Sequence, residues 1–337
     1  MSLKELILPK DYTSILDIKD TEIAIKIVKD TVERELAKRL KLIRVSAPLF
    51  VRPETGLNDN LSGIERPVEF DILELGANVQ IVQSLAKWKR MALQRYNFGA
   101  DHGLYTDMNA IRRDEDLDNL HSVYVDQWDW EKVITEETRN VETLKETVRA
   151  IMLALSDTQK ILAKSYPQLP NNIPTDIHFI TTQELEDMYP SLSPKDREHE
   201  ICKQYGAVFV MQIGDKLKSG RPHDMRSPDY DDWSLNGDIL VWYPLLGRSV
   251  EISSMGIRVS PEVLDAQLTK AHCDDRRKLL FHSLLLNNEL PLTMGGGIGQ
   301  SRLCMLLLHK AHIGEVQATV WTDKMVDACA KNGIYLL

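Results

Sequence analysis

The sequence predicts an α+β fold in which helices pack on a central, mainly antiparallel sheet. Apolar runs come in hairpin-like pairs, as at 239–243 and 250–254 on either side of the turn Pro244–Gly247, rather than in regular strand–helix alternation. Between the strands, two long segments show the four-residue apolar spacing of amphipathic helices. No linker separates independent units, so we expect residues 1–337 to form a single domain.

The N-terminal part predicts an irregular segment, a helix and a strand. Residues 1–19 have no periodic pattern, whereas Thr21–Leu40 repeats apolar residues at four-residue steps among Lys, Glu and Arg. A strand is expected at Leu42–Val45, and Pro48 suits its end because no ladder donor is needed there.

The middle of the chain predicts strands that lead into polar strings. We expect a strand at Val79–Ser84 before a helix with the basic patch Lys87-Trp88-Lys89-Arg90. Another strand is expected at Leu120–Val125, ending in Asp126-Gln127-Trp128-Asp129-Trp130. A second long helix is expected between Leu144 and Leu162. The remaining expectations are a loop at Tyr166–Pro174 and a strand at Ala207–Ile213.

Residues Leu292–Arg302 form the most informative segment, Leu-Thr-Met-Gly-Gly-Gly-Ile-Gly-Gln-Ser-Arg, before an apolar helical run. Glycines, among them Gly297 and Gly299, let backbone approach a ligand where a strand becomes a helix. Arg302 offers a planar, permanently charged fork to a phosphate, and no Gly-x-x-x-x-Gly-Lys-Ser/Thr string occurs. The segment predicts ATP bound through its phosphates; a glycine-rich turn with a solvated arginine is the alternative.

Composition excludes several classes of protein. The net charge of −9 disfavours nucleic acid as a partner. The longest apolar run is too short for a membrane span, and the N-terminus lacks the plan of a secretion signal. Four scattered cysteines predict free thiols in a reducing cytoplasm.

Clusters of carboxylates are expected near strand ends. Asp229-Tyr230-Asp231-Asp232-Trp233 holds three, with Asp238 and Glu251 following in a predicted hairpin. Such hard oxygen ligands suit Mg²⁺, which bridges to substrate phosphates, although acidic clusters are more often solvated faces. Gln127 and Asp129 are two residues apart on an extended strand and therefore share a face, where one amide and one carboxylate can recognise an amino acid. Arg112–Asp116 is expected to be a charged loop between two strands.

Taken together, these strings resemble the ammonia-dependent asparagine synthetase (aspartate–ammonia ligase) family, whose catalytic core is similar to that of class II aminoacyl-tRNA synthetases. The resemblance runs from about residue 20 to the C-terminus. The strings that carry it are Asp59–Gly63, Ser84–Arg90, Gly103–Thr106, His121–Trp130, Pro228–Trp233, Asn236–Trp242, Glu251–Arg258 and Gly295–Arg302.

The resemblance implies a nucleotide site and a metal site. Arg112 matches the arginine that contacts the α-phosphate of ATP, and Arg302 matches the one that contacts the terminal phosphate. Asp238 and Glu251 match the acidic pair that holds Mg²⁺ on the phosphates.

The resemblance also implies a pocket for L-aspartate and a reaction with ammonia. The matching residues are Asp59, Lys89, Gln127, Asp129 and Asp231, with Ser254 and Arg258 nearby. The activity implied is amidation of aspartate to asparagine through a β-aspartyl adenylate, releasing AMP and pyrophosphate. Asp231 or Asp129 would accept the proton of ammonium, and the sequence leaves the choice open.

Thr21–Pro48 matches the first class II motif, which implies a homodimer. Between Trp233 and Leu235 the chain is shorter than some relatives, which carry extra loop residues there, so closure of that loop over the ligand is in doubt.

Three alternative functions make different demands on the sequence. An aspartyl-tRNA synthetase-like enzyme would need an anticodon-binding domain and a basic surface. A non-catalytic paralogue would be expected to have lost an arginine or acidic residue of the site. A glutamine-dependent synthetase needs an N-terminal cysteine, and the first cysteine here is Cys202.

Overall fold

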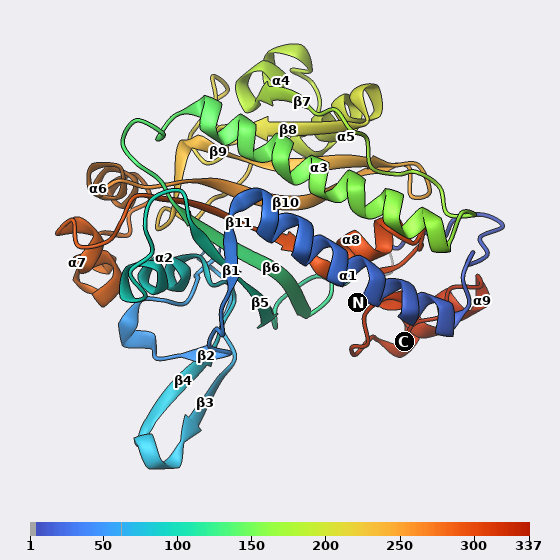
Figure 1. Ribbon diagram of the computed structural model, residues 1–337, viewed down its shortest axis with the longest axis horizontal. Coiled ribbons are helices and arrows are strands. Elements are labelled where there is room, and N and C mark those ends of the chain that lie inside the picture. The colour runs from blue at the N-terminus through green and yellow to red at the C-terminus, as the bar shows by residue number, and fades with distance from the viewer. Residues whose placement is uncertain (1–4, 62) are drawn as a thin grey trace.

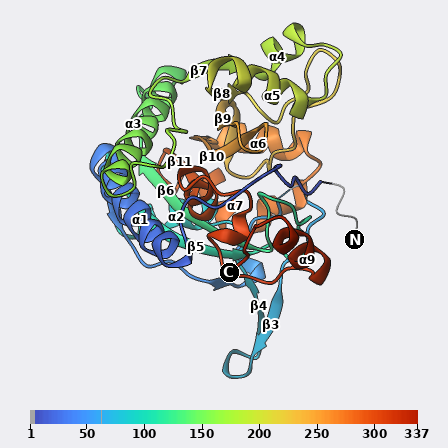
Figure 2. The ribbon, with the colours of Figure 1, turned by 90° about the vertical axis from the view of Figure 1, so that its right-hand side faces the viewer.

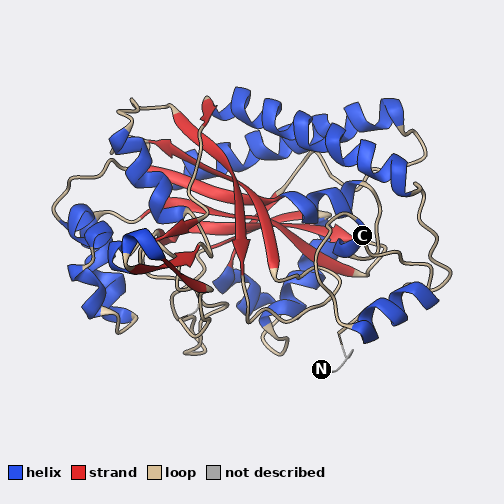
Figure 3. Ribbon diagram, turned by 90° about the horizontal axis from the view of Figure 1, so that it is seen from below, coloured by secondary structure: helices blue, strands red, loops and turns tan. Residues whose placement is uncertain are grey.

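The computed structural model describes residues 5–61 and 63–337. Residues 1–4 of the predicted irregular segment, and Ser62 of the Asp59–Gly63 string, lie outside the described residues. The described chain contains an eight-stranded sheet that runs through the middle of the molecule (Figure 3). Its strands, in order of neighbours, are β1 (Leu42–Arg44), β5 (Gly103–Ile111), β6 (Tyr124–Val133), β11 (Thr293–Gly299), β10 (Arg248–Arg258), β9 (Asp231–Tyr243), β8 (Ala207–Met211) and β7 (His178–Thr181).

The sheet is mostly antiparallel, as predicted. The two exceptions are at its edges, where β1 is parallel to β5 and β7 is parallel to β8. The hairpins β5–β6 and β9–β10 and the strand β11 between them form the antiparallel centre. The α+β fold class is therefore confirmed.

Helices cover the sheet. The long helices α1 and α3 lie side by side across one face (Figures 1 and 2). The predicted apolar stripe of α1, with Val28, Val32 and Leu36, is buried in the main core. It therefore packs within the chain. The helices of the described chain are α1 (Ile18–Leu40), α2 (Ala86–Arg95), α3 (Val141–Ser165), α4 (Thr182–Met188), α5 (Pro194–Tyr205), α6 (Pro261–Lys270), α7 (Leu280–Leu286), α8 (Gln300–Leu307) and α9 (Asp323–Lys331).

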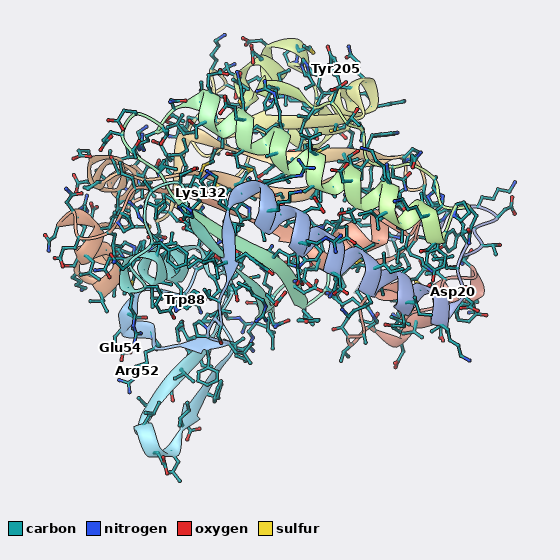
Figure 4. All side chains as sticks on the ribbon, in the orientation of Figure 1. Asp20, Arg52, Glu54, Trp88, Lys132 and Tyr205 are labelled. Atoms are coloured by element: carbon teal, nitrogen blue, oxygen red, sulfur yellow. The ribbon has the colours of Figure 1, made fainter. Side chains whose placement is uncertain are left out.

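A small second sheet projects from the body of the molecule (Figure 1). It consists of β2 (Phe50–Val51), β4 (Ala77–Ile81) and β3 (Glu69–Ile72). The strand predicted at Val79–Ser84 is therefore found at Ala77–Ile81, in this small sheet rather than in the central one, and its last three predicted residues are not strand. Arg52 and Glu54 lie near the base of the projection (Figure 4), with 3.7 Å between Arg52 Nη1 and Glu54 Oε1.

Several predicted bounds need correction. The strand predicted at Leu120–Val125 is wrong over its first four residues, where the Asp118 carboxylate accepts hydrogen bonds from the backbone N–H groups of Leu120 and His121. The strand starts at Tyr124 and includes the whole tryptophan string. Trp233 lies inside β9, so the short connection noted in the sequence is continuous strand.

Three other bounds differ by one or two residues: α1 begins at Ile18, inside the segment expected to be irregular, and the strands expected at Leu42–Val45 and Ala207–Ile213 end at Arg44 and Met211. Further expectations agree with the structure. The loop at Tyr166–Pro174 contains neither helix nor strand. The four cysteines are free. Within residues 5–61 and 63–337, no helix is long and apolar enough to cross a membrane.

Candidate active site

A cavity of about 680 Å³ opens over the centre of the sheet. Strands β6, β10 and β11, helix α2 and the loop at 224–227 all contribute to its wall. With one exception, Asp238, the cavity is lined by every residue predicted for the site. These are Asp59, Lys89, Arg112, Gln127, Asp129, Asp231, Glu251, Ser254, Arg258, Gly297, Gly299 and Arg302.

Strand register explains why distant residues meet here. Trp128 and Trp130 of β6 are fully buried in the core, so Gln127, Asp129 and Glu131 lie on the opposite face. Across the sheet, Asp129 pairs with Gly297, Gly297 with Ser254, and Ser254 with Asp238. Directly paired residues face the same side of a sheet, so this row runs from the β6 end of the site to its β9 end.

The glycines of β11 make room for the side chains of β6. A Cβ atom on Gly295 would lie 2.0 Å from Glu131 Oε2, and one on Gly297 would lie 2.3 Å from Gln127 Oε1. The sequence interpretation assigned these glycines to ligand approach alone. The structure shows that they also prevent a clash with polar side chains of β6.

One end of the cavity is a set of interlocked charges, which we call the buried charge cluster: Lys89, Asp129, Glu131, Asp231 and Arg258. All five are at most 4% exposed. Lys89 Nζ donates to Asp129 Oδ1 at 2.6 Å and lies 3.9 Å from Glu131 Oε2. Arg258 donates to Glu131 through Nε at 3.0 Å and Nη2 at 2.7 Å, and its Nη1 pairs with Asp231. The cations are thereby fixed before any ligand arrives.

Burial sets the pKa directions in this cluster. It lowers the pKa of Lys89, with the charges of Asp129 and Glu131 opposing the effect. It raises the pKa of Asp231, against the opposing charges of Arg258 and Arg226. Lys89 also donates to the carbonyl oxygens of Trp130 and Gly296, at 3.0 and 3.2 Å, which uses all three of its N–H donors. Lys89 therefore acts on a ligand through its charge, and it can donate a hydrogen bond to a ligand only by giving up one of these three bonds.

Two carboxylates of the site have distinct partners. Asp59 is buried, and its Oδ2 accepts a hydrogen bond from Tyr230 Oη at 3.0 Å. Asp129 Oδ2 is buried with no hydrogen-bond partner, although its other oxygen is bound by Lys89. A buried, unpartnered carboxylate oxygen that lines a cavity is suited to a cationic ligand.

The other end of the cavity, which we call the arginine end, is formed by Arg112, Arg302 and Glu251. Arg302 Nη1 donates to the backbone oxygen of Glu251 at 3.0 Å and lies 3.8 Å from its carboxylate. Arg302 follows the β11–α8 junction, as predicted. Arg112 directly follows β5, and its Nε is buried without a hydrogen-bond partner. Partial desolvation in the cavity raises the pKa of the half-exposed Glu251, but the charges of Arg302, Arg226 and Lys195 outweigh it and lower the pKa overall.

Asp238 does not line the cavity directly, but it is paired with Arg226, which does. The two side chains form an ion pair, and Asp238 Oδ1 is buried with no partner. Burial and the neighbouring charge of Glu251 raise the pKa of Asp238 to about 7, against the opposing charge of Arg226.

Among the described residues, no group of three or more His, Cys, Asp or Glu side chains could hold a metal ion. Mg²⁺ usually keeps several waters and takes one or two carboxylates plus phosphates. The unpartnered oxygen of Asp238 beside Glu251 therefore fits such an ion when it arrives with a nucleotide.

The acidic string Asp229–Asp232 separates in space. Asp231 joins the buried charge cluster. Asp229 accepts hydrogen bonds from His282 at 2.6 Å and Arg276 at 2.5 Å, and Asp232 pairs with Arg139 at 2.6 Å. These last two carboxylates serve structure.

Sequence reasoning missed Glu131 of the buried charge cluster and Arg226 of the cavity wall. Glu131 was predictable, because it follows Asp129 by two residues on the same face of the same strand. Arg226 gave no signal, because it lies in a loop without periodicity.

The fold first defines a class of protein. The chain is similar to the asparaginyl-tRNA synthetase of Entamoeba histolytica, with a TM-score of 0.64, 13% identity, and coverage of 89% of this chain and 67% of that one. It is also similar to the Pyrococcus horikoshii asparaginyl-tRNA synthetase complexed with asparaginyl-adenylate, with a TM-score of 0.63, 16% identity, and coverage of 88% and 68%. At these identities the likeness establishes a shared synthetase fold.

Sequence comparison then identifies the family. A family model described as aspartate-ammonia ligase matches residues 19–333. The aspartate–ammonia ligase of Ruminiclostridium cellulolyticum is 60% identical over 336 residues, covering 99% of this chain and 100% of the relative. That of Lactobacillus johnsonii is 60% identical over 334 residues, covering 98% and 99%. The chain belongs to the aspartate–ammonia ligase family, whose members are carbon–nitrogen ligases.

Proposed function

We propose that this protein forms L-asparagine from L-aspartate, ammonia and ATP through a β-aspartyl adenylate, with release of AMP and pyrophosphate. The observation that carries the proposal is one cavity with two unlike ends, in a chain of this family. The buried charge cluster suits a small zwitterion, and the arginine end suits a polyphosphate.

The charges at the cluster end are complementary to aspartate. The substrate has two carboxylates and one ammonium group. Arg258 and Lys89 supply positive charge for the carboxylates, while Asp59 and Asp129 supply negative charge for the ammonium. Gln127 and Ser254 line the same wall and supply neutral hydrogen-bonding groups.

Activation requires charge stabilisation more than covalent chemistry by the protein. A β-carboxylate oxygen attacks the α-phosphorus and pyrophosphate leaves. Negative charge grows on the phosphate oxygens, where Arg112 and Arg302 are positioned to stabilise it. Asp238 and Glu251 would hold Mg²⁺, which supplies further neutralisation of phosphate charge when it is bound.

Amination then requires a proton acceptor near the adenylate. Ammonium first loses a proton to a base. The nitrogen of the resulting ammonia then attacks the activated carbonyl carbon, AMP leaves, and the nitrogen loses a further proton to give the amide. Asp231 is favoured by the raised pKa that burial gives it, and Asp129 by its unpartnered buried oxygen. Both are retained as candidates.

We further propose that the protein acts in the cytoplasm as a homodimer without nucleic acid. Because the apolar stripe of α1 is buried within the chain, the dimer contact proposed for the Thr21–Pro48 segment would use its exposed surface, which includes the open edge of β1. Ile43 on β1 is 62% exposed, and the strand pairs on one side only. Sedimentation at micromolar concentration tests this: a stable, active monomer would contradict it.

The reaction is tested with purified protein, aspartate, ATP, Mg²⁺ and ammonium, without tRNA. We expect AMP and pyrophosphate in amounts equal to the asparagine formed. Aspartate-dependent release of ADP would overturn the adenylate mechanism. Aspartate activation without asparagine would favour an amino-acid-activating enzyme of the synthetase class instead.

A further inference from the structure

We propose that Arg226 is an exchangeable counter-ion, which neutralises Asp238 in the empty site and becomes a phosphate ligand when nucleotide and divalent cation bind. The inference rests on the proposed function, because it assigns the partner of Arg226 to the phosphates of the same substrate.

The first support is the unusual pairing of Arg226 with Asp238. Their ion pair is largely buried, with side-chain exposures of 16% and 7%. Both members keep an unpartnered buried atom, Nε of Arg226 and Oδ1 of Asp238. A pair built only for stability would be expected to satisfy these atoms. The open positions indicate that each side chain has a second partner.

The second support is position. Arg226 lines the cavity, and it acts electrostatically on both Asp231 and Glu251. Its charge therefore reaches both the buried charge cluster and the arginine end, and its side chain faces the cavity in which the phosphates adjoining the amino acid would be bound. A guanidinium there can bind phosphate oxygens through a fork of N–H donors.

The third support is how the loop that connects β8 to β9, and that contains Arg226, is attached to the rest of the protein. Its early part is tied to α4 and α5: Ser219 Oγ donates to Glu186 at 2.6 Å, and His223 Nε2 lies 3.0 Å from Glu198. The next residues, Asp224 and Met225, are exposed. Arg226 thus extends from an anchored base through a short exposed segment, which permits a change of side-chain partner without unfolding the loop.

The charges of the incoming cation and phosphates explain why Arg226 would exchange one partner for another. A divalent cation at Asp238 would place two positive charges beside the guanidinium, which disfavours the ion pair. The phosphates delivered with that cation offer the guanidinium a new anionic partner. The same residue therefore opposes cation binding in the absence of nucleotide and assists nucleotide binding in its presence.

This dual role predicts opposite effects of one substitution. In Arg226→Met without nucleotide, Mn²⁺ measured by its electron paramagnetic resonance should bind about tenfold to a hundredfold more tightly, the range for loss of a charge-assisted contact. Direct titration of the same variant with ATP and Mg²⁺ should show weaker nucleotide binding by a similar factor. Arg221→Met is the matched control, because Arg221 is exposed on the same loop, and both affinities should stay unchanged.

Arg226→Lys provides a second measurement should the methionine variant not fold. It keeps the charge but not the fork, so Mn²⁺ binding should remain near that of the original protein while nucleotide binding weakens. Unchanged Mn²⁺ affinity in Arg226→Met, or unchanged nucleotide affinity in both variants, overturns the inference. The unsubstituted protein is assayed in parallel: if it makes asparagine while the affinities fail to move, the inference alone has failed, and if it makes none, the proposed function has failed.

Discussion

The two ends of the cavity are built in opposite ways. At the buried charge cluster, five charged side chains are at most 6% exposed and bind one another. At the arginine end, the side chains of Arg302 and Glu251 are 20% and 37% exposed, and their charged groups approach each other only to 3.8 Å. In the buried charge cluster the charges are paired with one another within the folded protein, whereas the charges of the arginine end are left for a ligand to pair with.

The difference reflects what each end has to recognise. A small zwitterion gains specificity from fixed dipoles and charges that need no reorganisation during the reaction. A nucleotide with its cation brings strong charges of its own, so the protein can leave Arg112 and Arg302 less constrained. Substitutions at the cluster should therefore affect both stability and chemistry, and those at the arginine end chemistry alone.

The largest effect is expected for the proton acceptor. If Asp231 or Asp129 accepts the proton of ammonium, its asparagine variant should lose about 10²–10⁴-fold in asparagine formation. Aspartate-dependent exchange of pyrophosphate into ATP should fall far less, because the amide still occupies the site but cannot accept a proton. Measuring both half-reactions in Asp231→Asn and Asp129→Asn identifies the base. Equal loss of both half-reactions in both variants would assign these residues to aspartate binding.

Glu131→Gln tests whether the cluster is part of the folded core. Glu131 is the anion shared by Arg258 and Lys89, and it also accepts from Thr293 Oγ1 at 2.7 Å. Removing its charge leaves buried cations under-compensated, so the free energy of unfolding should fall by about 3 kcal/mol. Urea unfolding measures this, and the Michaelis constant for aspartate should rise in the same variant. A change below about 1 kcal/mol would mean that the cluster is not a constraint on folding.

Glu131 also illustrates how much of the site could be predicted from the sequence. The antiparallel α+β fold and the first long helix followed from apolar periodicity, and the alternation of Gln127 and Asp129 followed from the geometry of a strand. Extending that alternation by two residues would have found Glu131. The Asp238–Arg226 pair was not predictable, because it joins a strand to an irregular loop and no local pattern encodes that contact. For the same reason the sequence grouped Asp229, Asp231 and Asp232, although their side chains have three different sets of partners.

Arg302→Ala should separate chemistry from stability. Loss of one charge-assisted phosphate contact is worth about 1.5–3 kcal/mol, so pyrophosphate exchange should fall about tenfold to a hundredfold. Arg302→Lys should restore it only in part, because lysine keeps the charge without the planar fork. Unfolding by urea should be nearly unchanged in both variants. If turnover and the Michaelis constant for ATP stay unchanged in Arg302→Ala, the assignment of this arginine is wrong.

Glu251→Gln is the counterpart of Glu131→Gln and should have the smallest effect on folding. Both substitutions remove one negative charge beside an arginine and keep the shape of the side chain. Glu251, however, is more than one third exposed and 3.8 Å from Arg302, so water can compensate for the lost charge. We expect a change of less than about 1 kcal/mol in the free energy of unfolding, together with a clear loss of ATP-dependent activity if Glu251 helps to hold the cation. The two glutamine variants unfolded side by side in urea give the comparison directly. Equal destabilisation would show that the arginine end is as much a part of the folded core as the buried charge cluster, and the division of the cavity into two kinds of end would no longer hold.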